Sequence, residues 1–259
     1  MNVIYLRKDE FRRLVYERSE AFLDRIHEPS AFIVREFYDS SDILSLRGRI
    51  FETGRLTEPS WHPLHDDCPD YHRLHDNYPQ AYVRAKMHAF YYHGWYAANA
   101  DLFAYFGEIF AIKSFLAGCP KETFITNIPS TGPVARINFH NYPRGGGYLA
   151  EHIDPVFKLA SIQTLVQASS CRKDFSVGGL YARASDGAEK SYLDPLTSPG
   201  DLVVISPGIP HGVDAIDPKE DYRWREDSGK WTILPVIVNS DYPNPSHVKP
   251  RELGRSRES

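Results

Sequence analysis

The chain has 259 residues, 42% of them hydrophobic and 25% charged, with a formal net charge of −4. This composition is ordinary for a globular protein, and it offers no basic surface for nucleic acid. No run of about 18 apolar residues predicts a membrane span, and the first residues lack the apolar stretch of a signal peptide. Three widely spaced cysteines favour a reduced, cytoplasmic location. We therefore expect a cytoplasmic protein without nucleic-acid or membrane partners, and its oligomeric state stays open.

The first 125 residues are predicted to be a mostly helical flank. Apolar residues recur at helical spacing from Asp9 to Arg25, and residues 82–116 are apolar and aromatic enough for one or two buried helices. Between them, residues 58–76 are rich in Pro and His and predict a loop that acts as a lid. The histidines of this loop have no common zinc-site spacing, so a second metal site there is a minor alternative.

Residues 126–243 have a different pattern. Short runs of β-type sequence alternate with turns rich in glycine and proline; the runs cover residues 135–142, 162–167, 178–182, 199–206 and 230–238. Short strands at such close spacing favour a β-sandwich or barrel. We predict a single domain over residues 1–259, with its β core at 126–243 and a polar tail at 244–259 that frays.

Two histidines and one carboxylate are the strongest functional signal in the chain. His152 and Asp154 are two positions apart, so in an extended segment their side chains point to the same face. His211 follows 59 residues later (211 − 152) and could complete the set from a neighbouring strand. Two His and one carboxylate on one face of an ion leave the other positions open, which suits non-haem Fe(II) that activates oxygen. The sequence therefore predicts a metal-dependent oxidoreductase.

The order of motifs over residues 130–240 resembles that of the Fe(II)- and 2-oxoglutarate-dependent oxygenases. The motifs are Arg-Ile-Asn (136–138), Tyr-Pro-Arg-Gly-Gly-Gly (142–147), His-Ile-Asp (152–154), Gly-Gly-Leu (178–180), Pro-Gly-Asp-Leu-Val (199–203) and His-Gly-Val (211–213). The resemblance implies a double-stranded β-helix, or jelly-roll, core with flanking helices, hence a mainly β protein of the α+β class. It implies an enzyme with Fe(II) on His152, Asp154 and His211. Such an enzyme consumes O2 and 2-oxoglutarate and releases succinate, CO2 and an oxidised substrate.

The distal carboxylate of 2-oxoglutarate would need a cationic partner, because an unpaired buried carboxylate is costly. Members of the family usually supply an Arg on the last core strand, followed two residues later by Ser or Thr. This chain has Lys230 and Thr232 in that phase, so Lys stands where Arg is usual. Arg223 and Arg225 are the competing candidates, through a hairpin of residues 222–225 with residues 230–232. The sequence leaves this choice open.

Further candidates lie near the predicted iron ligands. Arg136 and Asn138 share one strand face, which is either the inside of the barrel or the solvated side of an edge strand. Facing inwards, Asn138 could donate to 2-oxoglutarate, with Tyr142 as a second donor, and Arg136 could hold a substrate carboxylate. Lys158 follows the His-x-Asp pair closely and is a second candidate substrate contact.

Asp154 also limits the reaction. Related iron halogenases have a small residue in place of this carboxylate, so halogenation is not expected. We expect oxidation of a C–H bond in a small polar substrate, such as an amino acid or a derivative, by hydroxylation, desaturation or ring closure. Two alternatives stay open. One is a cupin-type metal-dependent dioxygenase or lyase that does not use 2-oxoglutarate, and the other is a jelly-roll binding protein without catalytic activity.

Overall fold

The structure is a computed structural model that describes residues 1–77, 81–156 and 159–242. Its strands are β1 (Asn2–Arg7), β2 (Ser30–Arg35), β3 (Tyr71–Asp76), β4 (Ala85–His93), β5 (Val134–Tyr142), β6 (Gly147–His152), β7 (Gln163–Gln167), β8 (Gly179–Ala182), β9 (Ser191–Tyr192), β10 (Leu202–Ile205), β11 (His211–Ile216) and β12 (Lys230–Val238). They form one curled sheet in the order β1-β2-β10-β7-β12-β5-β4-β6-β11-β8-β9, with β3 paired to β4.

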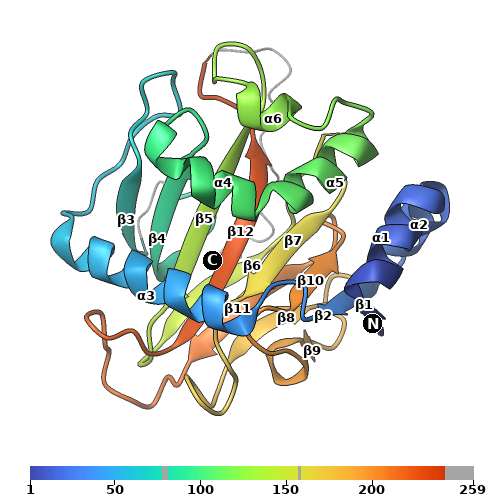
Figure 1. The fold of residues 1–259 in the computed structure, drawn as a ribbon. Helices are drawn as coiled ribbons and strands as arrows, with labels where there is room; N and C mark the ends of the chain where they lie inside the picture. Colours follow the sequence, from blue (N-terminus) through green and yellow to red (C-terminus); the bar gives the residue numbers. More distant parts are fainter. Residues whose placement is uncertain (78–80, 157–158, 243–259) are drawn as a thin grey trace, which may run out of the picture.

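The eight strands from β5 onward build a jelly roll. β10, β7, β12 and β5 lie side by side in one layer, and β6, β11, β8 and β9 form the other. The chain changes layer at nearly every turn between these strands, so the two layers enclose a common interior (Figure 1). The predicted fold class, mainly β with flanking helices around a double-stranded β-helix, is confirmed.

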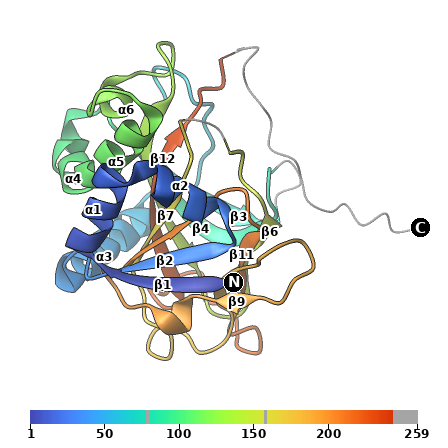
Figure 2. The same cartoon turned by 90° about the vertical axis from the view of Figure 1, so that its right-hand side faces the viewer.

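The helices belong mainly to the first half of the chain. They are α1 (Lys8–Glu17), α2 (Ser19–His27), α3 (Ser40–Leu56), α4 (Ala100–Tyr105), α5 (Gly107–Ala117) and α6 (Thr123–Thr126), with two short 3-10 helices, η1 (Ala97–Asn99) and η2 (Asp194–Leu196). Seen edge-on, the α-helices lie together on one side of the sheet (Figure 2). They cover the outer face of the layer that contains β5, β7 and β12, and leave the jelly-roll interior free.

Three details differ from the sequence prediction. The helix predicted over Asp9–Arg25 is two helices, because Arg18 lies between them with non-helical φ −139° and ψ 42°. The helical segment predicted from residue 82 begins with the strand β4, and β1, β2 and β3 are further strands of this region. Every second residue of β4 is buried, and the strand pairs with β5 on one side and with β3 or β6 on the other. This pairing outweighs the high local density of aromatic residues that suggested a helix.

Large apolar side chains fill the space between helices and sheet. Phe110 of α5, Phe139 of β5 and Trp231 of β12 belong to one core cluster and are fully buried. Each such side chain contributes roughly 1.5–3 kcal/mol relative to an exposed one. This packing fixes β5 and β12, whose opposite faces line the interior of the jelly roll.

The glycine-rich turn after β5 depends on Gly145. Its φ is +86°, and a Cβ built there would lie 2.4 Å from the carbonyl oxygen of Asp221. Only glycine meets both conditions without strain. The turn directs β6 back along the molecule, and so brings the end of β6 to the mouth of the jelly roll.

Among the helices of the described residues, none has the length and apolar character needed to span a membrane.

Candidate metal centre and its cavity

The three candidate metal ligands meet where β6 ends and β11 begins. The two strands pair antiparallel, with His152 directly opposite His211. Asp154 follows in the loop after β6, where its backbone N–H donates to the carbonyl oxygen of Pro207 at 2.9 Å. The strand register and this loop hydrogen bond therefore bring together three side chains that are up to 59 residues apart (211 − 152).

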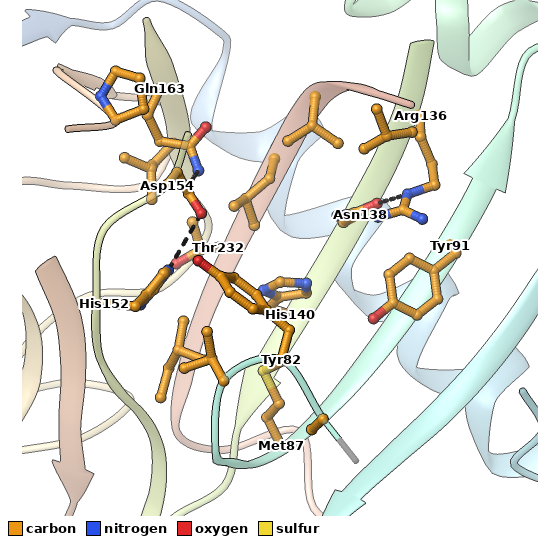
Figure 3. Close-up of a pocket in the computed structure, with 18 of the residues that line it drawn as sticks. Tyr82, Met87, Tyr91, Arg136, Asn138, His140, His152, Asp154, Gln163 and Thr232 are labelled. Atoms are coloured by element: carbon orange, nitrogen blue, oxygen red, sulfur yellow. Dashed lines mark hydrogen bonds and ion pairs between the residues drawn. The ribbon is translucent and has the colours of Figure 1, made fainter. Parts of the chain in front are cut away.

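The geometry suits one metal ion. The ligand atoms of His152, Asp154 and His211 all lie within 4.8 Å of one another, and no other such group of His, Cys, Asp or Glu occurs in the described ranges. His152 Nε2 is 3.7 Å from Asp154 Oδ1, and His211 Nε2 is 3.6 Å from Asp154 Oδ2. Figure 3 shows His152 and Asp154 on one wall of the cavity. Two imidazole nitrogens and one carboxylate oxygen are a common ligand set for Fe(II) that activates oxygen.

Both histidines are oriented by the backbone. His152 Nδ1 lies 3.0 Å from the carbonyl oxygen of Ala150, and His211 Nδ1 lies 2.9 Å from that of Ile209. A carbonyl only accepts, so each Nδ1 carries a proton, and each Nε2 faces Asp154, where it could give its lone pair to a metal ion. The ring orientations that a metal needs are thus present before the metal binds.

Protonation equilibria at the centre agree with this arrangement. Burial, aided by nearby His211, lowers the pKa of His152 to about 4, so its ring is neutral at pH 7. Burial alone would raise the pKa of Asp154, but the hydrogen bond and charge of His211 outweigh burial and lower it. Against the effect of burial, Asp154 in turn raises the pKa of His211. Gln163, the first residue of β7, donates from Nε2 to Asp154 Oδ2 at 3.1 Å. Asp154 is therefore an oriented carboxylate. Gln163 is a supporting residue that no motif in the sequence indicated.

The metal centre opens into a large cavity of about 1190 Å³. Alternate residues of β5 line it, Arg136, Asn138, His140 and Tyr142, together with Thr232, Leu234 and Val236 of β12. Of the two interpretations of this β5 face, the structure supports the one in which it faces the barrel interior. The wall formed by β5 and β12 lies across the cavity from the metal ligands (Figure 3).

Two polar atoms on that wall have no partner. Thr232 and His140 are cross-strand neighbours, and among the described atoms neither Thr232 Oγ1 nor His140 Nε2 has a hydrogen bond, although both are buried. His140 Nδ1 lies 3.3 Å from the hydroxyl of Tyr142. Burial lowers the pKa of His140 to about 3, so the ring is neutral. Unpartnered buried polar atoms are unusual in proteins, and here they face a cavity that could admit a ligand.

Lys230, two residues before Thr232, is fully buried, does not itself line the cavity, and already has partners. Its ammonium donates to Asp194 Oδ1 at 2.6 Å and to Gln167 Oε1 at 3.0 Å. Asp194 Oδ2 accepts the backbone N–H of Leu180 at 2.5 Å. These two hydrogen bonds use two of the three ammonium hydrogens, so one hydrogen remains. Asp194 balances the positive charge.

The other predicted cations are located differently. Residues 221–229 form no strand, so the expected hairpin with β12 is absent, and β12 pairs instead with β5 and β7. Arg223 forms ion pairs with Glu220 and Glu226 at the surface, and Arg225 is exposed. Neither lines the cavity. Lys158 lies outside the described residues.

A second buried lysine, Lys113, was missed by the sequence analysis. It belongs to α5, lines the cavity, and donates from Nζ to the carbonyl oxygen of Pro235 at 2.7 Å. Burial lowers the pKa of Lys113 to about 7, against the opposing attraction of Asp154. The one sequence signal was a single Lys within a mostly apolar helix, Gly107–Ala117.

The predicted lid segment is partly a strand. Residues 71–76 form β3, whereas Trp61, His62 and Leu64 of the preceding loop line the cavity. His72 stacks on His88 and His65 on Tyr242. Whether this loop closes over the cavity stays a prediction.

The comparisons with known proteins concern the fold. No family model matches the chain, and no curated protein matches its sequence. A prolyl-4-hydroxylase of Pseudomonas putida superposes with a TM-score of 0.51 at 13% identity, over 85% of this chain and 97% of that protein. A full-length Neurospora crassa protein in complex with alpha-KG superposes with a TM-score of 0.54 at 12% identity, over 92% and 85% of the two chains.

These likenesses extend over nearly all of the chain, and they include the helical flank as well as the jelly roll. The protein therefore has the same jelly-roll fold as these two proteins. At such low identity the fold is what the two proteins share with this chain, and the function has to be argued from the site.

Proposed function

We propose that this protein is an Fe(II)- and 2-oxoglutarate-dependent oxygenase that oxidises a C–H bond of a small polar substrate and releases succinate and CO2. The observation that carries the proposal is the convergence of His152 Nε2, His211 Nε2 and one Asp154 oxygen at the mouth of the jelly roll. Each histidine has its other ring nitrogen held by a backbone carbonyl. The solved Neurospora crassa structure with alpha-KG gives further support, since it combines this fold with that ligand.

In this proposal His152, Asp154 and His211 hold the iron. Fe(II) together with O2 and 2-oxoglutarate supplies an oxidant that can attack an unactivated C–H bond. Three protein ligands on one side of the ion leave the remaining positions to co-substrate and O2. Gln163 keeps the Asp154 carboxylate in place through its 3.1 Å hydrogen bond, as hydrogen bonds to metal ligands generally do.

The wall opposite the ligands fits the distal carboxylate of 2-oxoglutarate. Thr232 Oγ1 and His140 Nε2 are buried there without partners among the described residues, and a carboxylate could accept hydrogen bonds from groups of this kind. Lys230 lies on the same face of β12 and has an ammonium hydrogen to spare. We propose Lys230 with Thr232 as the anchor. Asn138 lines the same cavity, and because its Oδ1 accepts from Arg136, its Nδ2 hydrogens could donate to the co-substrate as a supporting contact. Arg223 and Arg225 lie outside the cavity.

One observation favours a second function. Asp194 neutralises Lys230, so the anchor has less free charge than an unpaired cation would have. A cupin-type dioxygenase or lyase would use the same metal ligands without 2-oxoglutarate, and would need no cation at this place.

Succinate formation separates the two functions. Purified protein would be freed of metal and supplied with Fe(II), 2-oxoglutarate and air, with a pool of amino acids and small acids as candidate substrates. We expect iron-dependent succinate from the wild type and none above background from Asp154→Ala with unchanged thermal unfolding. Absence of succinate, together with no 2-oxoglutarate binding to the Mn(II)-loaded protein under nitrogen, would overturn the proposal in favour of the second function.

A further inference from the structure

We propose that Arg136 binds a carboxylate of the organic substrate, and that this substrate is a small carboxylic acid with an apolar or aromatic body. The inference rests on the proposed oxygenase function and adds the substrate class. It starts from the position of Arg136 on β5, where the side chain faces the cavity opposite the metal ligands (Figure 3).

The guanidinium group of Arg136 is held in a fixed orientation. Its Nε donates to Asn138 Oδ1 at 2.9 Å, and the guanidinium carbon lies 4.6 Å from the ring centroid of Tyr91. Asn138 uses the Nε hydrogen, so both terminal nitrogens remain for a ligand. A planar group with its terminal donors free can bind a carboxylate through two parallel hydrogen bonds.

No carboxylate balances this charge within the described part of the chain. Several other arginines that are at least partly buried form ion pairs with acidic side chains: Arg12, Arg35, Arg47, Arg144, Arg183 and Arg223. Arg136 forms none there. A half-buried cation without a counter-ion is costly unless a ligand supplies the negative charge. The contrast with these ion-paired arginines therefore distinguishes Arg136 as a binding group.

The charge of the whole cavity favours an anion. Its basic lining residues are Arg73, Lys113 and Arg136, and its acidic ones are Asp154 and Asp241. Asp154 belongs to the metal centre, and Asp241 accepts the backbone N–H of Leu64 at 2.7 Å. A divalent ion at the centre would make the cavity more positive still. A negatively charged substrate would be attracted into such a cavity.

The surroundings of Arg136 suggest the rest of the substrate. The ring of Tyr91 lies next to the guanidinium, and the ring of Tyr71 packs against Tyr91 with centroids 4.6 Å apart. Met87 and Val238 line the same cavity. Trp61, in the loop before β3, also lines the cavity, and 58% of its surface is exposed. Flat aromatic and apolar surfaces bind the body of a ligand, while a few polar groups orient it. Because Arg136 and the metal ligands are on opposite walls, the oxidised carbon would be separated from the carboxylate by that body.

The test uses acids and their neutral amides as matched ligands. Binding to the Mn(II)- and 2-oxoglutarate-loaded protein is measured by calorimetry under nitrogen, for a set of small aliphatic and aromatic carboxylic acids and the corresponding primary amides. We expect wild type to bind at least one acid more tightly than its amide. Arg136→Met should weaken that acid by about 10- to 100-fold, the range for hydrogen bonds to a charged group. Arg136→Lys should restore part of the loss, and Arg49→Met, an exposed arginine on α3, should bind the acid as wild type does.

Each other outcome has a definite meaning. If the best ligands are neutral, or if Arg136→Met binds the acid as tightly as wild type, the proposal is wrong. If Arg136→Met instead loses affinity for 2-oxoglutarate, Arg136 is an anchor of the co-substrate, and the proposal is wrong in that way. Failure of the oxygenase function is visible separately, as absence of iron-dependent succinate in wild type. The acid and amide titrations with Mn(II)-loaded protein lacking 2-oxoglutarate would still decide the role of Arg136.

Discussion

The two ends of β12 each have a buried lysine beside them, in very different surroundings. At residues 232–233 the strand is paired with both β5 and β7. Next to them, the charge of Lys230 is balanced by Asp194, and Gln167 accepts a further hydrogen bond from its ammonium group. From residue 234 onward β12 no longer pairs with β7. There Lys113 donates a hydrogen bond to the carbonyl oxygen of Pro235 and forms no ion pair within the described chain.

The difference follows from how the sheet opens. Pro235 has no N–H to donate, and its carbonyl oxygen accepts hydrogen bonds from two side chains, Lys113 Nζ of α5 and Thr164 Oγ1 of β7. The closed part of the sheet thus balances its buried charge within the protein, whereas the open part, next to the metal centre, does not. We infer that the first region serves stability and that the second leaves a buried amine without an ion-pair partner in the described chain, next to the cavity. Four substitutions test this contrast.

The largest effect is expected for Asp194→Asn. Asn keeps an oxygen that can accept the backbone N–H of Leu180, but it removes the charge that balances Lys230. A buried cation left without its partner typically costs roughly 3–5 kcal/mol. We expect a loss of this size in the free energy of unfolding, measured with urea. The double variant Asp194→Asn with Lys230→Met should regain part of it, and a single variant as stable as wild type would contradict the assigned role.

The sequence predicted these two regions unequally well. Lys230 and Thr232 were found because the strand after the last turn is plainly β and alternation puts both on one face. Likewise, His152, Asp154 and His211 could be placed together because their strands were recognisable. Asp194 and Lys113 could not be assigned, since their contacts join segments 36 and 122 residues apart along the chain. Local patterns contain no information about such pairs.

A similar limit explains the error at residues 85–93. The sequence of this segment is Ala-Lys-Met-His-Ala-Phe-Tyr-Tyr-His. It contains no β-branched residue, so locally it is compatible with either a helix or a strand. Its place between β5 and β3 or β6 makes it a strand, and those partners are not visible in its local sequence. Tertiary pairing of this kind outweighs local propensity.

Lys113→Met should have the opposite sign from Asp194→Asn. Burial lowers the pKa of Lys113 to about 7 from its ordinary 10.5, so at pH 7 to 10 the unfolded chain binds more protons here than the folded chain. Stability contributed by this group therefore rises with pH across that window. Methionine removes the buried charge, and we expect a gain of about 2 kcal/mol near pH 7 that shrinks towards pH 10.

Urea unfolding of wild type and Lys113→Met at several pH values measures this difference. A gap between the two proteins that stayed constant from pH 7 to 10 would show that Lys113 titrates outside this range. A loss of stability at pH 7 would show that the hydrogen bond to Pro235 outweighs the cost of burying the amine.

Gln163→Leu probes the open region at the metal. Leucine fills similar space but cannot donate to Asp154, so the carboxylate loses its orienting hydrogen bond. Removal of a group that orients a metal ligand typically costs about tenfold or more in metal affinity. We expect the Kd for Mn(II), from a titration followed by electron paramagnetic resonance, to rise about tenfold. The unfolding midpoint of the metal-free variant serves as the control for folding, and unchanged Mn(II) affinity would mean that Gln163 does not support the site.

Thr232→Val gives the smallest expected effect and tests the closed region from inside the cavity. The substitution keeps the shape of the side chain and removes Oγ1, which has no partner within the described chain. If the hydroxyl served folding alone, its loss would leave ligand binding untouched or even stabilise the protein, since an unpartnered buried polar atom is removed. If it donates to 2-oxoglutarate, the Kd of the Mn(II)-loaded protein for 2-oxoglutarate should rise about fivefold, the equivalent of about 1 kcal/mol.

Thr232→Ser retains the hydroxyl and should bind as wild type does. Equal affinity of the Val and Ser variants would show that Thr232 is not part of the proposed anchor. It would also contradict the inference that this face of β12 contacts the co-substrate while Asp194 balances Lys230.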